Sequence, residues 1–224
     1  MRTFNSNSML RILGVFLLTA AALSAGAAAD PAEAPPREFV LELIETVNRV
    51  KKSDPEKGIE VTPAESKENE LLSDRLNRML DIEQISSYAL LEHWEKLDEK
   101  NRHLFVSTFT ELLKKVAYPN AAKFLRDLEV KVKTEKIVSN RAMVNTSVIH
   151  PEEGRIDIDY RLEQGKNSWA LVDVYLDGVS LKRNLRTQCL KIIRDHSFEE
   201  LISRMQEKID ERETADLKEV TGRD

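Results

Sequence analysis

Apolar residues recur every three or four positions through residues 37–125, which is the period of an amphipathic helix. Phe39, Leu43 and Val47 mark the first helix, and a loop rich in Pro and Gly follows over 53–65. The pattern predicts helices over residues 37–52, 71–80, 82–94, 98–116 and 121–125.

The period changes from 3.6 to 2 after residue 128, as expected where helices give way to strands. Val144, Thr146 and Val148, for example, alternate with polar neighbours. We predict half-buried strands over 128–133, 142–148 and 156–162, joined by turns short enough for antiparallel hairpins.

A fourth strand, over residues 168–177, has apolar positions on both faces. Trp169, Leu171, Asp173 and Tyr175 alternate along one face, and Ala, Val or Leu occupies the intervening positions. Both faces therefore need a cover, which helices or an apolar cavity can provide. With two more helical patterns, over 181–193 and 198–209, we predict an α+β fold: a four-stranded antiparallel sheet packed with several helices.

The N-terminus has the features of a secretory signal. Arg2 and Arg11 precede an apolar run from Ile12 to Leu23, which is shorter than the roughly 20 residues of a membrane-spanning helix. Small residues with an Ala-x-Ala site follow. We expect a signal peptide over 1–29, a single domain over 30–210 and a charged, flexible tail over 211–224.

Charge and cysteine content narrow the function. Of 34 basic residues, two lie in the expected signal peptide, which leaves 32 against 39 acidic residues. An acidic chain with interspersed signs lacks the basic face that nucleic acid requires, and it suits a soluble monomer. Cys189 is the single cysteine, so an intramolecular disulfide is excluded.

The sequence shows no arrangement typical of catalysis or metal binding. The four histidines are scattered, and no phosphate-binding loop or nucleophile motif occurs, so we expect no metal, no cofactor and no enzymatic activity. Asp173 is the one carboxylate whose strand face is otherwise apolar. It needs a partner if it is buried, and Arg186 is our candidate for an ion pair.

Two stretches resemble the toluene-tolerance family of periplasmic phospholipid-binding proteins, which belong to Mla-type lipid transport systems. The first runs from Tyr88 to Trp94 and on through Asn101-Arg102 to Tyr118. The second is more specific: Trp169-Ala-Leu-Val-Asp-Val-Tyr-Leu-Asp-Gly-Val-Ser-Leu181, followed by Asn184, Arg186 and Gln188. The order and spacing agree across nearly the whole chain after residue 29.

This resemblance implies a lipid carrier of the periplasm. Helices and an antiparallel sheet would enclose an apolar cavity for phospholipid acyl chains. The implied partners are an inner-membrane complex of an MCE-domain subunit with an ABC transporter, and an outer-membrane lipoprotein complex. Some relatives are associated with hopanoid transport, and Cys189 stands where the family often has Phe, so the lipid class stays open.

We predict two groups of site residues. Asn184, Arg186 and Gln188, with Asp173, are expected to meet a lipid headgroup or to serve as structural polar groups. The residues expected to line the acyl-chain cavity are Tyr88, Phe105, Phe109, Val130, Val144, Ile158, Tyr160, Trp169, Leu171 and Leu185.

Two other classes of function stay open at this point. One is an envelope hydrolase that uses a buried acid such as Asp173. The other is an interaction module that scaffolds an envelope complex without an interior ligand. Lipid that co-purifies with the protein would favour a carrier over a hydrolase and over an interaction module.

Overall fold

The computed structural model describes residues 34–53, 60–151, 154–165 and 168–221; the predicted signal peptide lies outside them. The helices, including the π-helical turn η3, are α1 (Pro36–Arg49), α2 (Pro63–Met79), α3 (Ile82–Leu90), α4 (Glu92–Lys96), α5 (Glu99–Leu112), η3 (Leu113–Ala117), α6 (Tyr118–Leu125), α7 (Leu181–Asp195) and α8 (Phe198–Thr221). The strands are β1 (Lys131–Val138), β2 (Arg141–His150), β3 (Gly154–Gln164), β4 (Trp169–Leu176) and β5 (Val179–Ser180).

The predicted α+β fold with an antiparallel sheet is confirmed, but the sheet has five strands in the order β1-β2-β3-β4-β5, one more than predicted. The additional strand, β5, is two residues long, too short to show an alternating pattern. It returns along β4 after Asp177 and Gly178, whose backbone φ angles are both positive. The turn therefore uses the conformation that glycine adopts most easily.

Helix α2 begins at Pro63, about two turns before the first apolar residues that suggested it. The start is fixed by a capping box instead of by packing. The Thr62 hydroxyl accepts a hydrogen bond from the Glu65 backbone, and the Glu65 carboxylate accepts one from the Thr62 backbone. A polar first turn held in this way gives no hydrophobic period.

Two other boundaries differ from the sequence pattern. The first strand begins at Lys131 and continues to Val138, where Ile137 and Val138 are exposed at the edge of the sheet. Burial supports the alternation predicted over 128–133, where Leu128, Val130 and Val132 are half-buried between exposed residues, but the alternation does not continue to Val138. Helix α8 continues to Thr221, into the segment that the sequence suggested was a charged tail.

A β-bulge in β4 reassigns its two faces. Arg161 of β3 pairs with Asp173, whereas the next residue, Leu162, pairs with Leu171, so Val172 is the extra residue. Leu171 lies on the face of Leu162, in the apolar core, and Asp173 lies on the opposite face. The predicted grouping of Asp173 with Leu171 is therefore wrong, because strict alternation does not hold across a bulge.

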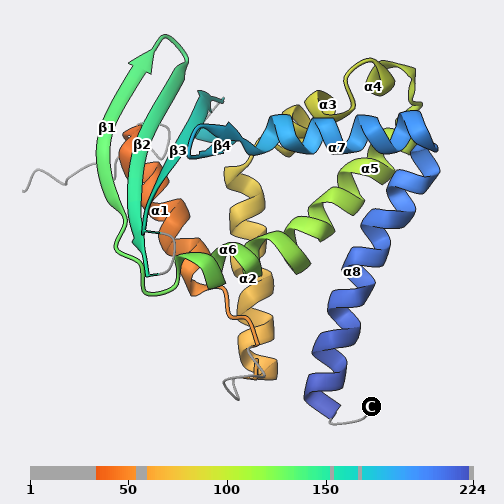
Figure 1. The fold of residues 1–224 in the computed structure, drawn as a ribbon, viewed down its shortest axis with the longest axis horizontal. Helices are drawn as coiled ribbons and strands as arrows, with labels where there is room; N and C mark the ends of the chain where they lie inside the picture. The colour runs from red at the N-terminus through yellow and green to blue at the C-terminus, as the bar shows by residue number, and fades with distance from the viewer. Residues whose placement is uncertain (1–33, 54–59, 152–153, 166–167, 222–224) are drawn as a thin grey trace, which may run out of the picture.

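The apolar interior consists of two groups of buried side chains. The sheet cluster comes from α1, α2, α6 and strands β2 to β4, and it includes Val40, Leu76, Val144 and Leu162. The helix cluster comes from α3, α5, α7 and α8, and its buried members are Ile85, Ala89, Leu90, Phe105, Phe109, Cys189, Leu201 and Met205. Figure 1 shows the sheet and α1 at one end of the molecule, α5, α7 and α8 at the other, and α2 between them.

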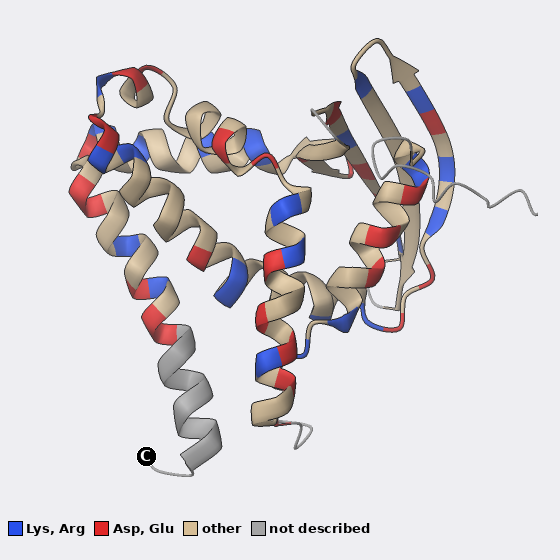
Figure 2. Cartoon of the chain, turned by 180° about the vertical axis from the view of Figure 1, so that it is seen from behind, with Lys and Arg blue, Asp and Glu red and all other residues tan. Residues whose placement is uncertain are grey.

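Charged residues of both signs are interspersed along the outer faces of the helices and on β1 (Figure 2). None of the helices among the described residues combines the length and the apolar character needed to cross a membrane.

Candidate functional site

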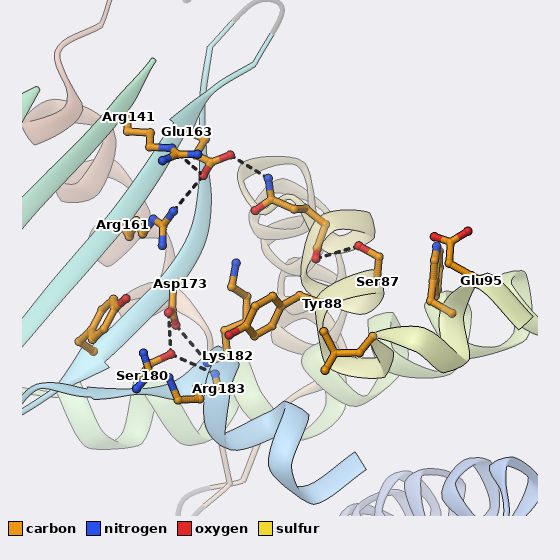
Figure 3. A pocket seen from close by; sticks show the side chains of 14 residues that line it. Ser87, Tyr88, Glu95, Arg141, Arg161, Glu163, Asp173, Ser180, Lys182 and Arg183 are labelled. Carbon is orange, nitrogen blue, oxygen red and sulfur yellow. Dashed lines mark hydrogen bonds and ion pairs between the residues drawn. The ribbon is translucent and has the colours of Figure 1, made fainter. Parts of the chain in front are cut away.

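An open pocket of about 580 Å³ lies between the sheet, the pair α3 and α4, and the start of α7 (Figure 3). The side chains around it are mostly polar or charged. They are Gln84, Ser87, Tyr88, Leu91, Trp94, Glu95, Arg141, Arg161, Glu163, Asp173, Tyr175, Ser180, Lys182 and Arg183.

The bulge in β4 determines which strand residues reach this pocket. After Val172, Asp173 pairs with Arg161 and Tyr175 with Asp159, which puts Asp173 and Tyr175 on the face away from the sheet cluster. Glu163 of β3 lies on the same face, next to Arg161 in the alternation. The polar side of the sheet therefore forms one wall of the pocket.

Asp173 is buried, with 6% of its surface exposed, and it has structural partners. One carboxylate oxygen accepts a hydrogen bond from the Ser180 hydroxyl at 2.6 Å, and the other accepts one from the Lys182 backbone N–H at 3.0 Å. The expected ion pair with Arg186 is therefore wrong. Arg186 lies one turn farther along α7, and the carboxylate is used by residues next to the helix start.

The Ser180 hydroxyl also accepts a hydrogen bond from the Arg183 backbone N–H at 3.0 Å, so it caps helix α7. Asp173, Ser180 and Lys182 thus form a short chain of hydrogen bonds that joins β4 to the first turn of α7. These hydrogen bonds fix the direction in which α7 leaves the sheet.

On the same wall, Glu163 of β3 contacts two arginines and an amide. Its carboxylate lies 3.4 Å from Arg141 Nε and 3.2 Å from Arg161 Nη2, and it accepts a hydrogen bond from the Gln84 amide at 2.8 Å. These contacts tie α3 to the sheet across the pocket. Arg141 and Arg161 therefore share the single negative charge of Glu163.

Tyr88 of α3 meets two cations of α7. Lys182 Nζ lies 4.6 Å from the centre of its ring, and the Arg186 guanidinium carbon lies 4.8 Å from it. Both are cation–π distances. Partial burial lowers the pKa of Lys182. The negative charge of Asp173 acts in the opposite direction but is the smaller effect.

The ten residues expected to line an acyl-chain cavity are divided between the two clusters. Val144, Ile158, Tyr160, Trp169 and Leu171 are buried in the sheet cluster, and Val130 packs against it. Phe105 and Phe109 are buried in the helix cluster, and Leu185 packs against it. Tyr88 lines the polar pocket instead.

The four polar residues predicted for the headgroup are also divided. Asp173 lines the pocket. Arg186 lies against the ring of Tyr88, which is another residue of the pocket lining. Asn184 and Gln188 are exposed on α7, where the Gln188 amide donates to the Asn184 oxygen at 3.1 Å. The structure therefore brings Asp173 and Arg186 near one pocket and leaves the two amides outside it.

Sequence reasoning missed Arg141, Arg161, Lys182 and Arg183. A signal for one of them was present, because Lys182 lies four residues before the predicted Arg186 in a helix and therefore shares a face with it. The position of Arg161 opposite Asp173 depends on the bulge and has no signature in a single sequence.

The described residues offer little for covalent or metal chemistry. No group of three His, Cys, Asp or Glu side chains that could hold a metal ion occurs among them. Burial raises the pKa of Cys189 to about 11, so its thiol carries almost no thiolate at neutral pH. The geometry is that of a binding surface with an ordered polar wall.

Replacing Asp173 tests whether this carboxylate is structural. We expect Asp173→Ala to lower the free energy of unfolding by about 2 kcal/mol, because it leaves the buried Ser180 hydroxyl and the Lys182 N–H without their acceptor. Asp173→Asn should cost less, since the amide oxygen still accepts one hydrogen bond. Urea denaturation measures both.

The control is Asp159→Ala on the adjacent strand. Asp159 is half-buried, and its side chain has no hydrogen bond or ion pair with any described residue, so we expect a change below about 0.5 kcal/mol. An Asp173→Asn variant that keeps full stability but loses hydrolysis of a lipid ester would contradict the structural role and favour the hydrolase.

Comparisons with known proteins were made for the sequence and for the fold. The family model described as "MlaC protein" matches residues 45–207. A solved structure of the phospholipid-binding protein from Ralstonia solanacearum, in complex with a phospholipid, is similar in fold, with a TM-score of 0.63 and 19% sequence identity. The match covers 80% of this chain and 98% of that one. No curated protein matches the chain.

Proposed function

The chain belongs to the MlaC protein family, and on that premise we propose that it is a lipid carrier of the periplasm. In this proposal the protein holds the acyl chains of a phospholipid in its apolar interior. It exchanges lipid with an inner-membrane complex of an MCE-domain subunit and an ABC transporter, and with an outer-membrane lipoprotein complex. The carrier acts as a monomer and uses no cofactor and no catalytic residue.

A carrier is needed because an acyl chain is costly to expose to water. At about 0.8 kcal/mol per methylene, transferring a 16-carbon chain into water costs on the order of 12 kcal/mol. A protein that covers the chain with apolar side chains removes most of this cost. The phospholipid complex of the Ralstonia solanacearum protein, which has a similar fold, supports the proposal.

The observation that carries the proposal is the division of the apolar interior. Among the described residues, Leu80 and Leu113 are the hydrophobic side chains that pack against both the sheet cluster and the helix cluster. Both are half-buried. We call this junction the seam, defined by Leu80 and Leu113.

The seam is the place where an acyl chain can enter at the lowest cost. Separating the clusters there breaks contacts of two half-buried leucines, whereas entry through the middle of either cluster disrupts fully buried side chains. Leu80 also forms a bridge to Leu171 of β4, so the sheet side of the seam is held in place. We propose that the predicted lining residues of both clusters contact the lipid once it occupies the seam.

Extraction of lipid from vesicles tests the proposal. We expect the protein lacking residues 1–29 to remove a phospholipid with a fluorescent acyl chain from vesicles and to hold it through gel filtration, at about one lipid per protein. A shift of fluorescence from the vesicle fraction to the protein fraction measures this. Fluorescence that stays with the vesicles at every protein concentration argues against a carrier.

A further inference from the structure

The pocket beside Tyr88 contains more positive charge than its own carboxylates neutralise. Glu163 forms ion pairs with Arg141 and Arg161, and Asp173 accepts hydrogen bonds from Ser180 and the Lys182 backbone. The lining still includes the side chains of Lys182 and Arg183, and Arg186 adjoins it. Among the described residues, none of these three cations has a carboxylate oxygen within 4.0 Å.

Lys182 and Arg186 are held close together by the same aromatic ring. They are four residues apart on α7, and each lies within 5 Å of the centre of the Tyr88 ring. Like charges at this spacing destabilise a helix, and partial burial lowers the pKa of Lys182. An anion between the two side chains relieves both costs.

Helix α7 connects this pocket to the apolar interior. Leu185 and Cys189 of α7 belong to the helix cluster, while Lys182 and Arg186 on the adjoining face lie at the pocket. Trp94 also connects the pocket with the apolar interior, because it lines the pocket and packs against the helix cluster. A molecule with an anionic group at Lys182 can therefore place an apolar part beside Trp94.

We propose that Lys182 and Arg186 bind a phosphate group in the pocket beside Tyr88. Where that phosphate is the diester of a carried phospholipid, the inference rests on the proposed function, and it adds that the headgroup is recognised and not merely left in solvent. Free phosphate has the same chemistry and is the other possible source.

The geometry favours phosphate over a simple neutralising ion. A guanidinium presents paired N–H donors that match two phosphate oxygens, and an ammonium adds a compact charge. The Tyr88 ring restricts both side chains, so less conformational entropy is lost on binding. The pocket, at about 580 Å³ and open to solvent, has room for a glycerophosphate group.

The experiment compares two lipids that share their acyl chains. Dioleoyl phosphatidylglycerol has a phosphate diester and dioleoylglycerol has none, and binding of each to the protein lacking residues 1–29 is measured by competition with a fluorescent lipid. The variant is Lys182→Gln with Arg186→Gln. Its matched control is Lys191→Gln with Arg194→Gln, which removes the same charge from exposed positions on α7.

We expect the Lys182/Arg186 double variant to bind phosphatidylglycerol on the order of 10-fold more weakly, because it loses two charge-assisted contacts. Its binding of dioleoylglycerol should stay within about 2-fold of the unsubstituted protein, and the control should match the unsubstituted protein for both lipids. Circular dichroism and thermal melting verify that each variant is folded. Equal binding of phosphatidylglycerol by all three proteins overturns the site.

Titration with inorganic phosphate at constant ionic strength, followed by NMR shifts of backbone amides on α7, separates the two sources. Shifts that disappear in the double variant support a site for the phosphate group itself. Weakened phosphatidylglycerol binding without such shifts supports recognition of lipid phosphate alone. If neither lipid binds any of the proteins, the carrier proposal fails, and the phosphate titration alone decides the site: shifts lost in the variant support it, and their absence overturns it.

Discussion

Replacing Leu113 with glutamine should weaken lipid binding by on the order of 10-fold while leaving the protein folded. Leu113 packs against both apolar clusters at the seam, so an acyl chain that enters there meets residue 113 directly. Burying an amide without a hydrogen-bond partner costs about 1–3 kcal/mol. In the lipid-free protein this cost is smaller, because residue 113 is half-buried and a glutamine can reach water. Competition with a fluorescent phospholipid measures the loss.

Leu104→Gln on α5 is the matched control. Leu104 is 41% exposed and lies outside both clusters, so the same change of side chain should leave lipid affinity unchanged. Equal affinity of the two variants would mean that the lipid does not pass through the seam. The carrier proposal would then need another route into the interior.

Truncating Phe105 to alanine should have the largest effect on stability. The side chain is completely buried in the helix cluster, and its ring lies 6.1 Å from that of Phe109. Removing such a ring costs about 3–5 kcal/mol, from lost burial and from the cavity that remains. Urea denaturation of lipid-free protein measures the change, with Leu104→Ala as a control expected to cost less than about 1 kcal/mol.

The result for Phe105 separates two roles of this residue. A side chain that lines an open cavity already lacks partners on one side, so its removal costs little in lipid-free protein. A loss below about 1.5 kcal/mol would therefore indicate that Phe105 lines a cavity and is not part of a packed core.

Most of the fold was predictable because its elements have strong local signals. Asp81 and Asp98 stand at the start of two predicted helices, where aspartate is a favoured cap, and in the structure each accepts a hydrogen bond from the backbone three residues later. The hairpin turn at Ser139 follows from turn residues between alternating stretches, and Ser139 has a positive φ. These features depend on residues close together in the sequence.

Other features of the fold have no signature in the hydrophobic pattern. The continuation of helix from Leu112 through η3 into α6 has no break at Pro119, because the proline lies in the first turn of α6, where no N–H is needed. The bulge at Val172 shifts Asp173 away from Leu171 without a change in hydrophobic pattern.

The candidate site was predictable only in part. Most of the aromatic and aliphatic residues predicted to line the cavity are buried, because alternation and helical spacing report burial. Spacing does not distinguish a packed core from a cavity wall, so the cavity lining itself stays a prediction. The residues of the polar pocket come from four separate parts of the chain. Their proximity is a property of the fold, so Arg161 and Lys182 were missed.

Native mass spectrometry of the protein, purified from a Gram-negative periplasm after removal of the predicted signal peptide, tests the central claim most directly. The account predicts a protein with one bound lipid, and extraction then identifies it. A phospholipid supports the proposed ligand, whereas a hopanoid keeps the carrier and changes the lipid class. An empty protein that also takes no lipid from vesicles would contradict the claim that this chain carries lipid.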